Sequence, residues 1–82
     1  MARVLVVDDE KSIRFFLNKI LTNAGHEVYV SAEPANAKAI LADKRFDVAV
    51  VDRILSDGQN GCDLVEHIKK VQPFCETILI SA

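Results

Sequence analysis

Three aspartates stand at positions in this sequence where their side chains can do chemistry together. Asp8 and Asp9 directly follow the apolar run at residues 4–7, and Asp52 directly follows a second apolar run at residues 48–51. If both runs are parallel strands of one sheet, the carboxylates meet at the edge where open α/β sheets bind ligands. Carboxylates a few ångströms apart disfavour one another's ionisation, and a divalent cation relieves that repulsion. The pattern therefore predicts an all-oxygen cation site, with Mg2+ as the usual occupant beside phosphate.

Helix capping is the alternative explanation for an aspartate that follows a strand. An aspartate before a helix can accept hydrogen bonds from free backbone amides, and for Asp9 alone this explanation has about equal weight. Capping accounts for one carboxylate per helix, however, so it does not explain two adjacent ones. It also does not explain Asp52, which precedes a predicted loop. The three residues together therefore favour a functional site.

The composition indicates one small domain with a packed core and no basic surface. The 82 residues are 50% hydrophobic and carry a formal net charge of −2. This balance argues against direct nucleic-acid binding, and no apolar run is long enough to span a membrane. His26 and His67 are isolated, which favours a loop and a helix-surface histidine over metal ligands. Cys62 and Cys75 match no metal or redox spacing, so we expect free thiols in a reducing cytosol.

Short apolar runs alternate with amphipathic stretches, which predicts β-α-β units around a parallel sheet. The predicted strands cover residues 3–7, 28–30, 46–51 and 77–80. The predicted helices cover residues 11–24, 34–43 and 62–71, and a polar loop covers residues 53–61. The first helix carries one apolar stripe, formed by Ile13, Phe16, Leu17, Ile20 and Leu21. The residues expected on the inner faces of the other two helices are Ala37, Ile40, Leu41, Leu64, Val65 and Ile68. Such an element order is typical of an α/β domain.

Several segments of the chain resemble the receiver domains of two-component response regulators. Residues 4–10 (VLVVDDE) are similar to the opening of these domains, and the resemblance continues through residues 50–52 (VVD). Gly61 at the start of the third helix and residues 78–82 (ILISA) extend it over the whole chain. The resemblance implies a flavodoxin-like (CheY-like), doubly wound parallel sheet with strand order 2-1-3-4-5, of which residues 1–82 form a part.

The resemblance also implies a role for each residue of the site. Asp52 matches the phosphoacceptor, which would attack a phosphohistidine on a sensor histidine kinase and become an aspartyl phosphate. Asp9 matches the direct Mg2+ ligand, and Asp8 matches a ligand that acts largely through water. Asp52 and the backbone carbonyl of Ile54 complete the implied metal site. Ser81 matches the switch hydroxyl that turns toward the phosphate.

The chain departs from the family pattern in two places. The family usually has a proline four residues after the phosphoacceptor and a glycine four residues further on. Here Ser56 holds the proline position, and Gly61 comes one residue late, an insertion that a turn at residues 57–58 can absorb. The sequence stops after the fourth predicted strand. The fifth strand, with the family's lysine, and the last two helices therefore have no counterpart in it.

This organisation predicts an uncovered sheet face. Right-handed crossovers place the first helix on one face and the second and third helices on the other. One alternating set of the third strand, either Val48 and Val50 or Ala49 and Val51, is then left facing water. Apolar faces and open strand edges promote association. We therefore expect self-association through the faces of the third and fourth strands.

The leading functional hypothesis is a non-enzymatic, cytoplasmic signalling module with Mg2+ as its cofactor. Phosphorylation of Asp52 would change a surface that an output domain or effector outside this sequence reads. One alternative is a receiver that is not phosphorylated and acts as an interaction module. A second is a small phosphohydrolase with an aspartate nucleophile, although that class typically has Asp-x-Asp after its first strand. Any contact with DNA would belong to an output domain.

Overall fold

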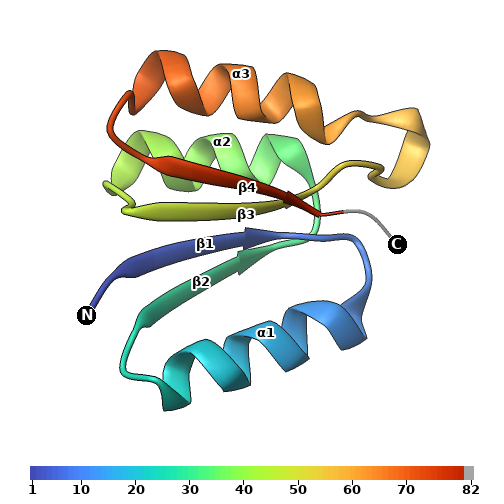
Figure 1. Cartoon of the computed structure of the whole chain (residues 1–82). Coiled ribbons are helices and arrows are strands. Elements are labelled where there is room, and N and C mark those ends of the chain that lie inside the picture. The colour runs from blue at the N-terminus through green and yellow to red at the C-terminus, as the bar shows by residue number, and fades with distance from the viewer. Residues whose placement is uncertain (81–82) are drawn as a thin grey trace.

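The structure is a computed structural model that describes residues 1–80, apart from the side chain of residue 57. Four parallel strands form one sheet in the order β2-β1-β3-β4 (Figure 1). These strands are β1 (Arg3–Val7), β2 (Glu27–Ser31), β3 (Val48–Asp52) and β4 (Glu76–Ile80). The predicted α/β class and the order 2-1-3-4 are confirmed.

Three helices cover the two faces of the sheet unequally. They are α1 (Lys11–Asn23), α2 (Pro34–Asp43) and α3 (Gly61–Val71), and a short 3-10 helix, η1 (Ser56–Gly58), precedes α3. Figure 1 shows α1 on one side of the sheet and α2 and α3 on the other. This is the arrangement that right-handed crossovers produce when the chain passes from β2 across β1 to β3.

The boundaries of β3 differ from the prediction at both ends. Phe46 is buried, but its N–H donates to Oε1 of Gln72 at 2.8 Å instead of joining the sheet. The strand therefore begins at Val48. At its other end it includes Asp52, which pairs with Ile80 of β4. The site aspartate is thus held by the sheet itself and does not merely follow it.

The core lies between the sheet and the pair α2 and α3. Leu5 and Val7 of β1 point to this side, as do Ala49 and Val51 of β3, and all four are fully buried. The helix residues that meet them in the core cluster are Ala37, Leu41, Leu64 and Ile68. The inner faces predicted for α2 and α3 are therefore confirmed.

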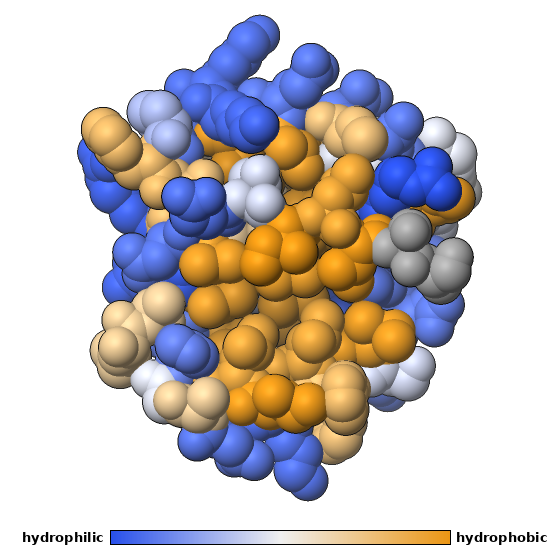
Figure 2. All heavy atoms as spheres, in the orientation of Figure 1, coloured by the Kyte–Doolittle hydropathy of each residue, from blue (hydrophilic) through white to orange (hydrophobic). Residues whose placement is uncertain are grey.

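The α1 side of the sheet is much less covered. No residue of α1 is buried, and Phe16 and Ile20 of its apolar stripe are 58% and 46% exposed. Val50 is only half-buried, and its β4 neighbour Ile78 is 50% exposed. Figure 2 shows a continuous apolar surface in the middle of the molecule. The physical reason is that α1 lies over β2 and β1 and does not reach β3 and β4.

Candidate functional site

The sheet brings the three aspartates to one edge. Val7 at the end of β1 is level with Val51 in the parallel pair with β3, so Asp8 and Asp52, which follow them, come to the same edge. One carboxylate oxygen from each of Asp8, Asp9 and Asp52 lies within 4.8 Å of those of the other two. Among the described residues, these three aspartates form the group of side chains that could hold a metal ion. The predicted convergence is therefore confirmed.

The three carboxylates meet different surroundings. Asp8 is 3% exposed, Asp52 is partly buried and Asp9 is exposed. Burial raises the pKa of Asp8, and the negative charges of Asp52, Asp9 and Glu10 raise it further. The N–H of Glu10, which donates to Asp8 Oδ1 at 2.9 Å, acts in the opposite direction. The charged form of Asp8 is thus disfavoured, and a nearby cation would favour it.

The turn from β1 into α1 shows that the aspartates are not simple helix caps. The N-cap position of α1 is Glu10, and no side chain accepts a capping hydrogen bond there. Asp8 bonds to the N–H of Glu10, which lies before the helix. Its own N–H donates to the carbonyl of Ser31 in β2 at 3.0 Å, and its carbonyl accepts from Nη1 of Arg14 at 2.9 Å. The capping explanation is therefore wrong for Asp9.

Asp52 and the glycine at the start of α3 pack backbone to backbone. The N–H of Gly61 donates to the carbonyl of Arg53 at 2.8 Å. A Cβ atom at Gly61 would overlap the carbonyl oxygen of Asp52. Only glycine permits this approach, so it is required by the site's geometry and not by an unusual backbone angle. The N–H of Ile54 donates to Asp52 Oδ1 at 3.1 Å, which orients the carboxylate.

The extra residue of the loop is accommodated within η1. Gly58 has a φ of 71°, and the N–H of Gln59 donates to the carbonyl of Ser56 at 3.3 Å. Leu55 before this turn is buried in the core, which anchors the loop. After the turn, Asn60 caps α3 by accepting from the N–H of Cys62 at 2.8 Å. This agrees with an insertion absorbed at residues 57–58.

The predicted roles of Ile54 and Ser81 are not tested by the described residues. The side chain of Ile54 is 61% exposed, and its carbonyl as a metal ligand stays a prediction. Ser81 lies outside the described residues. Arg14, in contrast, is a site-adjacent residue that the sequence reading missed. Its position in the first turn of α1 could have indicated a contact with the end of β1, because helical side chains point back toward the N-terminus of their helix.

The isolated histidines and cysteines are not members of the acidic cluster. Nδ1 of His26 accepts a hydrogen bond from the backbone N–H of Ala2 at 3.0 Å, and His67 lies on α3. Cys62 is exposed and Cys75 is buried, and both are free thiols. Burial raises the pKa of Cys75, with smaller contributions from the charges of nearby Asp47 and Glu76. The predicted free thiols and the place of His67 on a helix are therefore confirmed.

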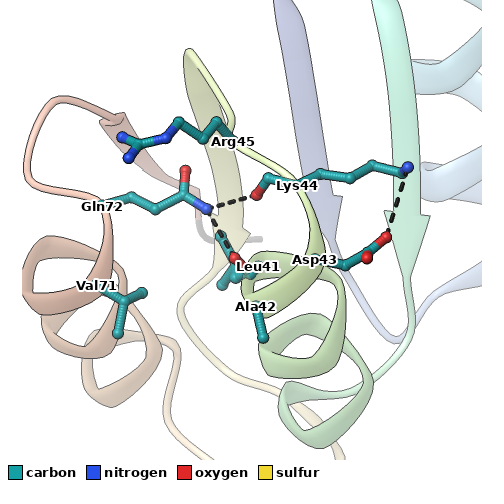
Figure 3. A pocket seen from close by; sticks show the side chains of 7 residues that line it. All are labelled: Leu41, Ala42, Asp43, Lys44, Arg45, Val71 and Gln72. Carbon is teal, nitrogen blue, oxygen red and sulfur yellow. Dashed lines mark hydrogen bonds and ion pairs between the residues drawn. The ribbon is translucent and has the colours of Figure 1, made fainter.

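A hollow of about 300 Å³ lies at the opposite, amino end of the sheet. The residues lining it are Leu41, Ala42, Asp43, Lys44, Arg45, Val71 and Gln72 (Figure 3). Nε2 of Gln72 donates to the carbonyls of Leu41 and Lys44 at 2.9 and 2.7 Å. Because these bonds join α3 to the end of α2, the hollow is a structural junction, and the acidic edge remains the candidate site.

Comparison with known proteins decides the family. A family model described as the response regulator receiver domain matches residues 4–82. The chain belongs to this family. Receiver domains are signalling proteins rather than enzymes, so the predicted non-enzymatic class is confirmed. The resemblance given by the aspartates and their strands is confirmed as well.

Relatives of this receiver domain include both long and short proteins. The transcriptional regulator NtrC of Azospirillum brasilense is 36% identical over 81 residues, which are 99% of this chain and 17% of NtrC. The chemotaxis protein CheY of Thermotoga maritima is 32% identical, with 98% of this chain and 67% of CheY covered. The crystal structure of a CheY-like receiver protein from Methanospirillum hungatei matches with a TM-score of 0.93 at 30% identity, covering 99% of this chain and 64% of that one. This chain therefore spans only part of its relatives' lengths.

In the part that the structure describes, no helix has both the length and the apolar character needed to cross a membrane.

Proposed function

We propose that this receiver domain takes a phosphoryl group onto Asp52 from a sensor histidine kinase, with Mg2+ bound at the acidic edge. The observation that carries the proposal is the convergence of three carboxylates within 4.8 Å at the carboxyl ends of β1 and β3. Membership of the receiver family supports a phosphoacceptor role in a two-component system. We place this phosphotransfer in the cytoplasm. We assign the response to phosphorylation to an output domain or effector beyond these residues.

The donor set fits a hard divalent cation. Asp8, Asp9 and Asp52 offer only oxygen atoms, the ligands that Mg2+ prefers. The raised pKa of Asp8, caused first by burial and further by the charges of Asp52 and Asp9, is of the kind that a bound cation would offset. We assign the Ile54 carbonyl as a further ligand by analogy with the family. When bound, Mg2+ supplies positive charge that neutralises the carboxylates and the transferring phosphoryl group.

Asp52 acts as the nucleophile in this proposal. A carboxylate oxygen forms the new P–O bond while the P–N bond of the phosphohistidine breaks, and the imidazole nitrogen keeps the electron pair. Because Oδ1 of Asp52 accepts from the N–H of Ile54, we assign the attack to Oδ2. The edge position of Asp52 at the end of β3 leaves it only partly buried, as a nucleophile for a protein donor must be. Ser81 is the proposed hydroxyl that responds to the phosphate.

The substitution Asp52→Asn tests the nucleophile. This variant should keep the fold, because an amide oxygen can still accept from Ile54, and it should take up no phosphoryl group from a small-molecule phosphodonor. The measurement is intact-mass spectrometry after incubation with the donor and Mg2+, with thermal unfolding as the control for the fold. Phosphorylation of the Asp52→Asn variant would show that the assignment is wrong.

An amide-resolved NMR titration tests the site as a whole. Mg2+ is added first, and beryllofluoride, a mimic of the phosphoryl group, is added second. Shifts at Asp9, Asp52, Ile54 and Ser81 that require both additions are the expected result. A spectrum that responds to Mg2+ alone would support the alternative of a receiver that is not phosphorylated.

We also propose that a polypeptide of these 82 residues associates with itself through the α1 side of β3 and β4. The support is the apolar surface that Figure 2 shows, together with the half exposure of Ile78 on β4 and of Phe16 and Ile20 on α1. Apolar patches of this kind drive association in water. Static light scattering over a concentration series should show a mass that rises above that of one chain. A stable monomer at high concentration would contradict this proposal.

A further inference from the structure

The first turn of α1 is joined to the end of β1 by one side chain. The helix has no side-chain cap at its N-terminus and no acidic residue in its first turn. Nη1 of Arg14 donates to the backbone carbonyl of Asp8 at 2.9 Å, and Arg14 is half-buried. Its guanidinium therefore links the helix to the end of the strand, while no side chain caps the helix there.

With this bond, Asp8 is held by three hydrogen bonds to different partners. The N–H of Asp8 donates to Ser31 in β2, its Oδ1 accepts from the N–H of Glu10, and its carbonyl accepts from Arg14. Only the last of these bonds comes from another residue's side chain, so only it can be removed without changing the backbone or Asp8 itself. The exposed Asp9 comes next in the chain, and the path of the backbone leaving Asp8 sets where its carboxylate lies.

We infer that Arg14 is a positioning residue for the cation site. It holds the β1–α1 turn in the conformation in which the Asp8 and Asp9 carboxylates converge on Asp52, and it acts on the cation only through them. The inference rests on the proposed Mg2+ site. Residues that orient metal ligands in this way typically change metal affinity 10–100-fold when they are replaced. A guanidinium also differs from an ammonium in its planar fork of donors, so charge and positioning can be separated by substitution.

Mg2+ titration of three variants tests this role. Arg14→Gln removes the charge and the fork, and Arg14→Lys keeps the charge. Lys11→Gln is the matched control, because it removes one exposed positive charge from the first residue of the same helix. We expect both Arg14 variants to bind Mg2+ about tenfold more weakly than the parent, while Lys11→Gln changes affinity less than about twofold. The readout is the dissociation constant from amide shifts, with thermal unfolding to confirm the fold.

Two results would overturn the inference. Unchanged affinity in both Arg14 variants would show that the bond does not matter to the site, and tighter Mg2+ binding by Arg14→Gln would show that Arg14 acts only as a charge that repels the cation. If the parent chain binds no Mg2+, the proposed function fails instead. Hydrogen exchange of the metal-free protein then still tests Arg14, because its loss should speed exchange at the Glu10 amide. Unchanged exchange there would overturn the positioning role independently of the metal.

Discussion

The two ends of the sheet use charged side chains in opposite ways. At the carboxyl end, Asp8, Asp9 and Asp52 crowd together, and the pKa of Asp8 is raised. At the amino end, Glu27 is surrounded by partners, and its pKa is lowered. The same kind of group is therefore destabilised at one end of the strands and stabilised at the other, within one small domain.

At the amino end, other residues of the chain supply the partners of the Glu27 carboxylate. The Tyr29 hydroxyl donates to Glu27 Oε2 at 2.7 Å, and Arg3 Nε lies 3.1 Å from the same oxygen. These contacts lower the pKa of Glu27, with the Tyr29 bond as the largest cause. The ammonium of Lys44 lies 5.5 Å from the centre of the Tyr29 ring. Glu27 is therefore already compensated by partners within the chain.

The carboxyl end lacks such partners for its carboxylates. Arg14 bonds to a backbone carbonyl of Asp8, and only backbone N–H groups donate to the Asp8 and Asp52 carboxylates in the described part of the chain. The crowding is relieved only by a proton or a cation. The comparison teaches that a functional edge can be distinguished from a structural one by whether its charges are already compensated.

The largest effect is expected from replacing the glycine that lets α3 approach the site. Gly61→Ala should cost about 3 kcal/mol of unfolding free energy, because its methyl group meets the rigid carbonyl of Asp52. The measurement is denaturant unfolding. Gly58→Ala is the control. Nothing lies within 4 Å of its added Cβ and its φ is +71°, so about 1 kcal/mol is expected from backbone strain alone. Equal losses in both variants would contradict the close approach at Gly61.

The substitution Asp8→Asn probes the crowding at the carboxyl end directly. Its side-chain oxygen can still accept from the Glu10 N–H, and its charge is gone. We expect the metal-free protein to gain stability on the order of 1 kcal/mol at neutral pH, since burial and the neighbouring charges of Asp52 and Asp9 disfavour a charged group at this position. Chemical unfolding in the presence of a chelator measures this. A less stable variant would mean that repulsion does not dominate at this edge.

The pH dependence of stability should separate the two ends. Asp8 has a raised pKa, so its contribution is full below its ordinary value of 3.8 and is lost as the pH rises through the raised value. Glu27 has a lowered pKa, so its contribution is present above 4.5 and is lost as the pH falls. The advantage of Asp8→Asn over the parent should therefore grow as the pH rises from about 4, in metal-free unfolding experiments. An advantage that stays constant with pH would argue against titration of Asp8.

The smallest effect is expected at the amino end. Glu27→Gln should lower stability only slightly, because its ion pair with Arg3 is largely exposed and such pairs contribute little. It should leave the affinity for Mg2+ unchanged, since it lies at the opposite end of the strand from the carboxylates. Isothermal titration with Mg2+ checks this. A clear loss of Mg2+ affinity would show that the two ends are energetically coupled.

The sequence by itself determined the architecture and the residues that meet at the acidic edge. Alternating apolar runs and helical stripes predicted the parallel sheet, and the places of Asp8, Asp9 and Asp52 after two of its strands predicted their convergence. These features depend on local hydrophobic periodicity, which can be read from consecutive residues. The inner faces of α2 and α3 followed from the same periodicity and are buried as expected.

Only the tertiary structure decided how the edge is held and which face stays open. The bond from Arg14 to Asp8, the approach of Gly61 to Asp52 and the bond from Phe46 to Gln72 all join residues that are far apart in the secondary structure. Periodicity carries no information on such pairs, because they depend on how elements pack in space. The same reason explains Phe16, which has the spacing of a core residue in α1 and is nevertheless exposed.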